Sequence, residues 1–218
     1  MKMENLDLTL YLVTDSTGMG EKDFLYVVQQ ACEGGVTIVQ LREKEKTGLE
    51  YFKLAESVKK ITDQYKIPLI IDDRVDIALA VDAAGVHVGQ SDMPVFAARK
   101  LLGNNKIVGA TAKTIAQAQK AKEEGADYLG VGAIFPTTTK VITVITEVSM
   151  LNDIVRQTNM RVVAIGGLNA SNMHVLYDSM AEGIAVVTAI MKSKDPHEAA
   201  RSLKQLVVEN FPKQKVKS

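Results

Sequence analysis

Cysteine is almost absent from this chain, which has a single cysteine, Cys32, among its 218 residues. One thiol excludes an internal disulfide and is typical of a reducing compartment. Long apolar runs are missing too, since none approaches the roughly 18 residues of a membrane-spanning helix. The opening MKMENLDLTL does not have the pattern of a signal peptide. We therefore expect a cytoplasmic protein with no membrane contact.

An excess of charge of either sign is also lacking. The chain has 26 basic and 26 acidic residues, so its bulk charge does not indicate a nucleic-acid partner. It contains no GxGxxG motif, no HExxH motif and no Ser/His/Asp arrangement. What is present is a hydrophobic fraction of 46%, which is enough for a sizeable core.

Short apolar runs alternate with amphipathic runs along the whole chain. The apolar runs are continuous rather than alternating, as expected for parallel strands covered on both faces. No linker divides the chain, so we predict one domain over 1–218, with a barrel at about 8–210 and a polar tail at 211–218. The predicted strands are 8–14, 36–42, 68–73, 86–89, 107–111, 128–134, 161–167 and 184–188. The predicted helices are 22–33, 49–64, 75–83, 94–102, 115–124, 148–157, 172–179 and 196–208.

Eight strand–helix units favour an α/β fold, a single (β/α)8 TIM barrel. A weak repeat supports it, because Gly34, Gly85, Gly125 and Gly183 each follow a predicted helix and precede every second strand. We expect these glycines to supply the positive φ that ends a helix. The alternative is an open doubly wound sheet, which usually has a Gly-rich first turn that this chain lacks.

Polar residues follow nearly every predicted strand. In a barrel these strand ends share one rim, which is where barrel enzymes place their active sites. We therefore predict a site on that rim. The segments concerned are 14–16, 40–44, 72–74, 89–92, 111–114, 137–140, 166–169 and 187–189.

Cations and carboxylates both occur among these strand ends. Carboxylates that face cations beside an anionic ligand are explained by Mg²⁺, which takes one or two carboxylates plus phosphate oxygens. The alternative is that Asp72 and Asp73 form structural pairs with Arg74 or Lys113. The charged residues are Arg42, Lys44, Lys113, Lys140, Asp72, Asp73 and Asp92.

The segment YLGVGAIFPTTTK, residues 128–140, begins as a strand and breaks at Pro136. Three threonines and Lys140 follow, and such hydroxyls with one ammonium can hold a phosphate. The alternative is a polar turn that only ends the strand. Barrels frequently bind phosphate after strands seven and eight, here at Gly166–Gly167 and Val187–Thr188, so the rim has room for two anionic groups.

Histidines contribute little to this prediction. His174 and His197 lie in predicted helices and are interpreted as solvated side chains. His87 lies inside a short buried strand, a position more typical of a hydrogen-bonded core histidine than of a catalytic base.

Six motifs and an opening segment together resemble the thiamine-phosphate synthase family. They are QLREK at 40–44, DDR at 72–74, HVGQSD at 87–92, FPTTTK at 135–140, AIGGL at 164–168 and VVTAI at 186–190, with LYLVTD at 10–15. The resemblance extends over about 8–210. It implies a (β/α)8 barrel that joins hydroxymethylpyrimidine diphosphate to hydroxyethylthiazole phosphate with Mg²⁺, giving thiamine phosphate and pyrophosphate.

The resemblance also implies roles for individual residues. Asp73 and Asp92 would be the Mg²⁺ ligands, and Lys44, Thr111 and Lys140 the catalytic residues. The pyrimidine diphosphate would be held by Gln40, Arg42, Lys44, Asp72, Thr111 and Lys140. The thiazole phosphate would be held by Thr137, Thr139, Gly167, Val187 and Thr188.

Three positions depart from the family pattern. Asp72 stands where the family usually has Asn, and Lys113 where many relatives have His. The loop 141–146 is unusually apolar and would either close over the site or pack in a homo-oligomer. Two other functions stay open, an isomerase acting on a thiazole phosphate and a non-catalytic phosphate-binding barrel. The transferase is favoured by the retained charges Arg42, Lys44, Asp73, Asp92 and Lys140.

Overall fold

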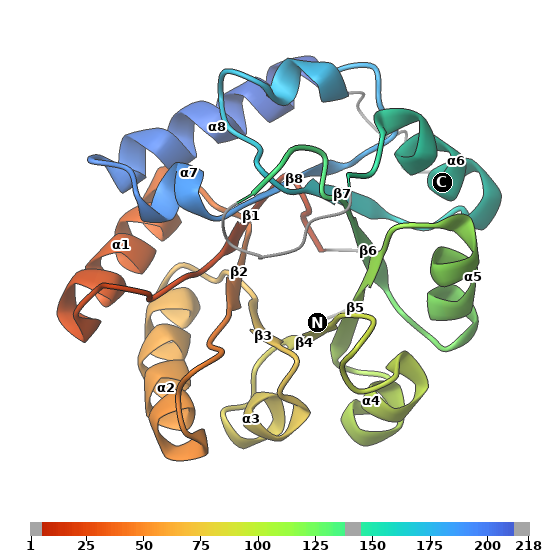
Figure 1. The fold of residues 1–218 in the computed structure, drawn as a ribbon. Helices are drawn as coiled ribbons and strands as arrows, with labels where there is room; N and C mark the ends of the chain where they lie inside the picture. Colours follow the sequence, from red (N-terminus) through yellow and green to blue (C-terminus); the bar gives the residue numbers. More distant parts are fainter. Residues whose placement is uncertain (1–5, 138–144, 212–218) are drawn as a thin grey trace.

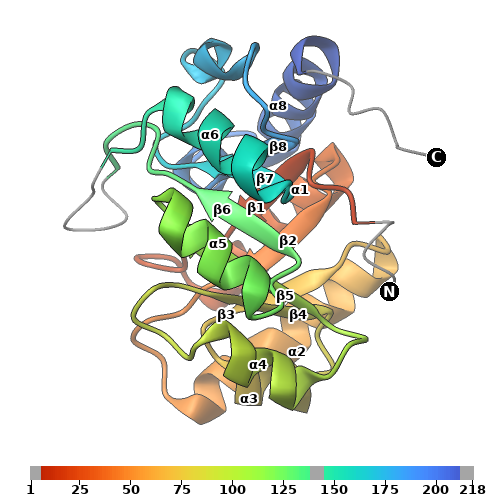
Figure 2. The same ribbon diagram turned by 90° about the vertical axis from the view of Figure 1, so that its right-hand side faces the viewer.

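The computed structural model describes residues 6–137 and 145–211 and contains a closed barrel of eight parallel strands. Each strand pairs with the next, and β1 pairs with β8. The helices surround the barrel on the outside (Figure 1), and a view from the side shows the strands running through its middle (Figure 2). The predicted (β/α)8 barrel is confirmed.

Six of the eight strands are shorter than predicted, because hydrogen-bonded pairing covers only part of each apolar run; β4 has the predicted length and β5 is one residue longer. Six of the eight pairs align three residues of one strand with three of the next. The strands are β1 (Leu10–Val13), β2 (Ile38–Leu41), β3 (Leu69–Asp72), β4 (Gly85–Val88), β5 (Ile107–Ala112), β6 (Tyr128–Val131), β7 (Val162–Ile165) and β8 (Gly183–Val186).

Seven predicted helices are present, with ends that differ by a few residues. None of the described helices is long and apolar enough to cross a membrane. The helices are α1 (Glu21–Gly34), α2 (Gly48–Gln64), α3 (Val75–Ala80), α4 (Val95–Leu102), α5 (Ile115–Glu123), α6 (Val148–Thr158) and α8 (Pro196–Asn210).

The region after β7 differs from the prediction. In place of a helix at 172–179 there is one 3-10 turn, η2 (Met173–Leu176), and a short helix, α7 (Thr188–Met191), follows β8. The side chain of Asn172 accepts from the backbone N–H of Asn169 and donates to the carbonyl of Gly167. Such local side-chain bonds compete with the helical pattern and hold this segment as a loop.

Apolar side chains form two separate cores. Inside the barrel, large side chains such as Tyr11, Ile70 and Tyr128 pack together. Between strands and helices a larger core contains the alternate strand residues, including Leu10 and Leu12 on either side of Tyr11. This inside–outside alternation follows from the two-residue period of a strand.

The predicted role of the repeated glycines is only partly right. Of the four, Gly125 has a positive φ of 95°, whereas Gly34 is the last residue of α1 and Gly35 takes the left-handed conformation at 103°. Close packing explains Gly34 instead, since a Cβ there would lie 2.3 Å from the carbonyl oxygen of His197 in α8.

Gly85 and Gly183 begin strands β4 and β8 rather than ending helices. A Cβ on Gly85 would lie 2.0 Å from the carbonyl oxygen of Ile107, and one on Gly183 would lie 2.0 Å from that of Leu8. These glycines are therefore needed for the close approach of neighbouring segments. Three of the four repeated glycines, Gly34, Gly85 and Gly183, thus mark close contacts, whereas Gly125 supplies a positive φ.

The predicted polar tail begins one residue too early. Phe211 is buried, and its ring lies 6.3 Å from that of Tyr177 between the ring centroids. Residue 211 therefore belongs to the packed structure, and the remainder of the predicted tail lies outside the described residues.

We predict that Gly85→Ala lowers the free energy of unfolding by about 2–4 kcal/mol, as overpacking that shifts backbone does. The measurement is urea denaturation followed by circular dichroism. Gly48→Ala is the matched control, because the added Cβ meets only the end of Arg74 at 3.7 Å. An equal, small effect of both substitutions would contradict the tight contact between β4 and β5.

Candidate active site

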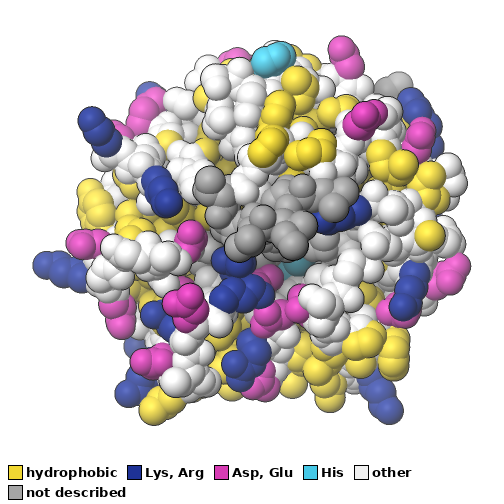
Figure 3. All heavy atoms as spheres, viewed as in Figure 1, with side chains coloured by type: hydrophobic (Ala, Val, Ile, Leu, Met, Phe, Trp, Pro, Cys, Tyr) yellow, Lys and Arg dark blue, Asp and Glu magenta, His cyan; other side chains and the backbone are white. Residues whose placement is uncertain are grey.

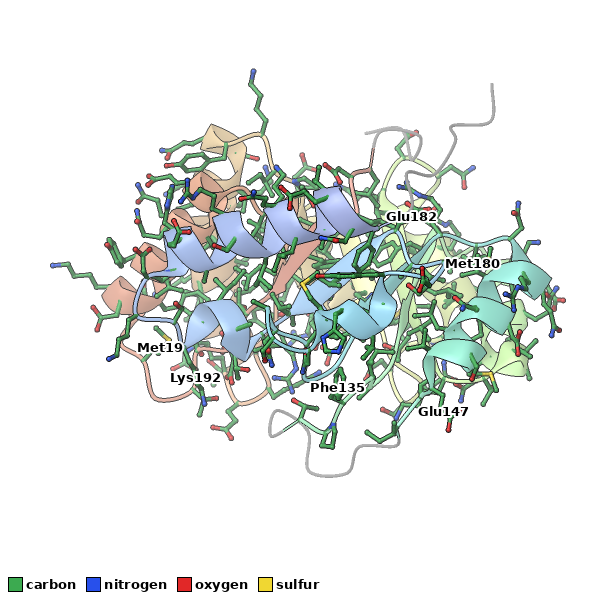
Figure 4. The ribbon with its side chains drawn as sticks, turned by 90° about the horizontal axis from the view of Figure 1, so that it is seen from above. Met19, Phe135, Glu147, Met180, Glu182 and Lys192 are labelled. Carbon is green, nitrogen blue, oxygen red and sulfur yellow. The ribbon has the colours of Figure 1, made fainter. Side chains whose placement is uncertain are left out.

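The polar strand ends gather on one rim of the barrel, as predicted. Met19, Phe135 and Lys192, which follow strands β1, β6 and β8, lie along one edge in Figure 4, whereas Glu182, which precedes β8, lies on the opposite side. Figure 3 views the first of these faces. Basic and acidic side chains and one histidine gather there beside the centre.

A cavity opens at this rim. Ten of the eleven predicted site residues that the structure describes line it, and the exception is Asp73. Thr139 and Lys140 lie outside the described residues. The predicted residues that line the cavity are Gln40, Arg42, Lys44, Asp72, Asp92, Thr111, Thr137, Gly167, Val187 and Thr188.

Lys44 joins the ends of β2 and β3. Its Nζ lies 2.7 Å from Oδ2 of Asp72 and also donates to Oδ2 of Asp73. Arg42 Nε lies 3.9 Å from the same Asp72 oxygen. Burial opposes the charged ammonium, but the hydrogen bonds from both carboxylates prevail and raise the pKa of Lys44.

The predicted alternative pairing of these carboxylates with Arg74 is wrong. Arg74 instead makes a two-point pair with Asp76, with Nε 2.9 Å from Oδ1. Asp72 and Asp73 are thus left to Lys44, at the cavity. Lys113 also lines the cavity and pairs with neither carboxylate within the described ranges.

Asp73 and Asp92 form a carboxylate-rich corner. Burial, followed by the repulsion of Asp72 and Asp92, raises the pKa of Asp73 despite its bond from Lys44. Asp92 is fixed by the backbone N–H of Gly89, which donates to Oδ2 at 2.7 Å. A divalent cation has the charge that this corner needs, so the donor set fits Mg²⁺, although the described residues hold no cluster of three metal-binding side chains.

The opposite side of the cavity is built from the ends of β6, β7 and β8. Gly166 and Gly167 both have positive φ, at 109° and 62°. A Cβ on Gly167 would lie 2.6 Å from the carbonyl oxygen of Pro136, so the two loops touch at this point. Gly167, Thr137 and Thr188 thereby line one end of the cavity.

Of the predicted apolar loop 141–146, the structure describes only residues 145 and 146. Thr146 is buried, and its N–H donates to the carbonyl of Ala133 at 2.8 Å, whereas Ile145 is exposed. Residues 141–144 lie outside the described residues, so the predicted flap or oligomer contact stays a prediction.

Two tyrosines and a histidine form a part of the site that the sequence prediction missed. Tyr11, Tyr128 and His87 meet inside the barrel, beneath Gln40 and Thr111, and are linked by hydrogen bonds. His87 is thus the hydrogen-bonded histidine that the sequence favoured, yet it also lines the cavity. The available signal was one polar ring in each of three short apolar strands.

Comparison with known proteins places this site in a family. The family model described as "Thiamine monophosphate synthase" matches residues 10–190. The chain belongs to the thiamine monophosphate synthase family. It is therefore an enzyme, a transferase of thiamine biosynthesis.

Individual relatives agree along nearly their whole length. The chain is 50% identical over 201 residues to a thiamine-phosphate synthase of Methanobrevibacter smithii, covering 92% of this chain and 96% of the relative. It is 53% identical to thiamine-phosphate synthase 2 of Streptococcus pneumoniae, covering 86% and 90%. A solved thiamine phosphate pyrophosphorylase from Pyrococcus furiosus superposes with a TM-score of 0.87 at 36% identity, covering 97% and 100%.

Glu43 provides a test of the electrostatics beside the cavity. Its side chain is 5% exposed, Ser16 Oγ donates to Oε2 at 2.7 Å, and Oε1 has no hydrogen-bond partner within the described part of the chain. Burial raises its pKa above that of an exposed glutamate. A raised folded-state pKa favours the folded protein below the unfolded pKa, and this contribution is lost as the pH rises through the folded pKa.

We therefore predict that lowering the pH from 7.5 to about 5 stabilises the wild type relative to Glu43→Gln. The measurement is the free energy of unfolding of both proteins in urea at each pH. Glu45→Gln, at an exposed position in the same loop, should show no such relative change. A pH-independent difference between wild type and Glu43→Gln would contradict the buried carboxyl.

Proposed function

We propose that this transferase condenses 4-amino-2-methyl-5-hydroxymethylpyrimidine diphosphate with 4-methyl-5-(2-hydroxyethyl)thiazole phosphate. The products are thiamine phosphate and pyrophosphate. The observation that carries the proposal is the pairing of Lys44 with Asp72 and Asp73 at one end of a cavity whose other end is a separate set of donors. Two differently charged ends suit two differently charged substrates.

The pyrimidine diphosphate belongs, in this proposal, at the ends of β2 to β5. Gln40 and Thr111 supply an amide and a hydroxyl for the ring, and Arg42 and Lys44 supply charge for the diphosphate. The predicted role of Lys140 on the same diphosphate stays a prediction, because this residue lies outside the described ranges.

The metal belongs at the corner formed by Asp73 and Asp92. Mg²⁺ takes few protein ligands and fills its remaining positions with phosphate oxygens and water, so two carboxylates are sufficient. When bound, it would supply positive charge to the departing pyrophosphate. The repulsion that Asp72 and Asp92 exert on Asp73 supports this placement, because a divalent cation between these carboxylates would offset it.

The thiazole phosphate belongs at the ends of β6 to β8. Thr137 and Thr188 supply hydroxyl groups, and Gly167 and Val187 bring the backbone to the cavity wall. Barrels frequently bind phosphate after strands seven and eight, which supports this assignment. Thr139 would add a third hydroxyl, as the sequence predicts.

The proposed reaction requires one bond to break and one to form. The C–O bond between the pyrimidine methylene and the diphosphate breaks, and its electron pair leaves with pyrophosphate. The thiazole nitrogen then donates its lone pair to the methylene carbon. Arg42 and Lys44 would stabilise the negative charge that develops on the leaving group.

Water must be kept from the pyrimidine methylene while it is electron-poor. Apolar side chains line the cavity between its two polar ends, and they are Val13, Val163, Ile165, Leu168, Ala185 and Val186. An apolar wall offers no nucleophile and excludes water, which favours attack by the thiazole nitrogen. No group in this scheme has to act as a general base.

We predict that the purified protein with both substrates and Mg²⁺ forms thiamine phosphate and pyrophosphate in equal amounts. Either substrate alone should yield neither product. Lys44→Ala should lower kcat/KM by about 10²–10³, because it removes charge that stabilises the transition state. Lys46→Ala, in the same loop, is the matched control and should stay within about threefold, as expected of a surface substitution. Conversion of a thiazole phosphate without pyrophosphate release would contradict the proposal.

A separate prediction concerns the metal. Asp92→Asn should raise the Mg²⁺ concentration required for half-maximal rate and lower the rate at saturation by about 10²-fold, since a lost ligand costs several kcal/mol of charge stabilisation. Asp82→Asn, which precedes β4 at the opposite end of the barrel, serves as the control. The measurement is the rate of each variant as Mg²⁺ is added back after removal of metal with a chelator. Near-normal rates of Asp73→Asn and Asp92→Asn at low Mg²⁺ would show that these carboxylates do not hold the metal.

A further inference from the structure

A continuous chain of hydrogen bonds crosses the inside of the barrel from β2 to β5. Gln40 Nε2 donates to the Tyr11 hydroxyl at 2.8 Å, and the hydroxyls of Tyr11 and Tyr128 lie 2.7 Å apart. The Tyr128 hydroxyl lies 3.1 Å from His87 Nδ1, and His87 Nε2 lies 3.0 Å from Thr111 Oγ1. The two ends of this chain, Gln40 and Thr111, are both at the proposed pyrimidine end of the cavity.

Space for this chain is built into the strands beside it. A Cβ on Gly109 would lie 2.3 Å from Cζ of Tyr128 and 2.6 Å from Nδ1 of His87. A Cβ on Gly130 would lie 3.2 Å from Cε1 of His87. Strands β5 and β6 therefore lack side chains where the rings of Tyr128 and His87 cross the interior.

Each phenol has one proton, so the orientation of the Gln40 amide, with Nε2 toward Tyr11, sets the direction of the hydrogen-bond chain. Tyr11 accepts from Gln40, so its own proton goes to Tyr128, and the proton of Tyr128 goes to His87 Nδ1. The opposite order would make Tyr11 accept twice and leave its proton without an acceptor within the described residues, which is unfavourable for a buried hydroxyl. Burial raises the pKa of Tyr11 and of Tyr128, so both phenols keep their protons.

The direction of the chain determines what its ends present to a ligand. With Nδ1 accepting, neutral His87 carries its proton on Nε2 and donates it to Thr111 Oγ1. The hydroxyl proton of Thr111 then points to another acceptor. At the other end, Gln40 Nε2 donates to the Tyr11 hydroxyl, which fixes the orientation of the amide. Oε1 of Gln40 is then the atom that can accept a hydrogen bond from a ligand.

We propose that Tyr11, Tyr128 and His87 are positioning residues that set Thr111 as a donor and Gln40 Oε1 as an acceptor for an aminopyrimidine ring. Such a ring carries acceptor nitrogens and an exocyclic amino donor, which match these two groups. The oxo tautomer of a hydroxypyrimidine presents a carbonyl oxygen in place of the amino group and would face Gln40 Oε1 with a second acceptor. The identity of the ligand in this inference rests on the proposed function. The direction of the hydrogen-bond chain is independent of it.

The direction is tested without any substrate. ¹⁵N NMR of the imidazole groups in the full-length protein should show His87 as the neutral Nε2–H form at pH 7.5. The variant His87→Asn is used to assign the signals of His87. In Tyr128→Phe the Nδ1 acceptor loses its donor, so the tautomer mixture should shift toward Nδ1–H. An imidazolium or an Nδ1–H tautomer in the wild type would overturn the proposed direction, whatever reaction the enzyme performs.

The positioning role is tested by steady-state kinetics of Tyr11→Phe and Tyr128→Phe. Each should raise KM for the pyrimidine diphosphate by about tenfold, the value of one hydrogen bond, and leave KM for the thiazole phosphate within twofold. In a Gln40→Ala/Thr111→Ala background, Tyr128→Phe should no longer change the pyrimidine KM. Thr158→Val is the control, because it removes a buried hydroxyl that donates at 2.7 Å to Ile154 in α6, away from the cavity.

The outcomes separate the two proposals. If the wild type forms no thiamine phosphate, the proposed function fails, while the NMR result still decides the direction of the chain. If the wild type is active but the tyrosine variants change only thermal stability, lower only the apparent kcat as loss of folded enzyme would, or raise both KM values alike, the positioning role is overturned. A persistent effect of Tyr128→Phe in the background lacking both ends would also overturn it.

Discussion

The room inside the barrel is the constraint on which the rest of the site depends. Eight strands leave an interior that side chains must fill, and here two tyrosines and a histidine share it with branched apolar side chains such as Ile38 and Ile70. The rings of Tyr128 and His87 fit because Gly109 and Gly130 have no side chains. The interior therefore contains a hydrogen-bonded polar group that links Gln40 to Thr111.

Charge at the rim is organised around that floor. Lys44 contacts two carboxylates that belong to consecutive residues of one strand end, and Asp73 reaches its position in a left-handed conformation with φ of 51°. The resemblance implies Asn at the position of Asp72, and the contact of this carboxylate with Lys44 gives the extra negative charge a partner. An asparagine there would leave Lys44 with Asp73 alone. The departure from the family pattern thus alters how Lys44 is held more than how the barrel folds.

Much of the fold followed from the sequence because its signals are local. Continuous apolar runs at regular intervals predict parallel strands, and the polar residues after them predict a shared rim. The failures involve contacts between distant segments. Gly85 and Gly183 appeared to be helix ends, yet they are required by the carbonyls of Ile107 and Leu8 in neighbouring segments.

The site shows the same division. Residue types at the strand ends identified the cavity lining, but they left Arg74 as a candidate partner for Asp72. Only the structure shows that Arg74 pairs with Asp76 and that Lys44 is the partner of Asp72. The Tyr11–Tyr128 contact joins residues 117 positions apart, so the sequence shows a polar ring in each strand but not that the rings meet.

Closure of the barrel joins the beginning of the chain to its end. Strand β1 pairs with β8, and α1 packs against α8, as Figure 1 shows on one side of the barrel. During synthesis, β1 therefore has one unpaired edge until almost the entire chain has emerged from the ribosome. An exposed strand edge can pair with other chains. The order of synthesis thus makes the late arrival of β8 and α8 the step at which a nascent chain is protected from aggregation.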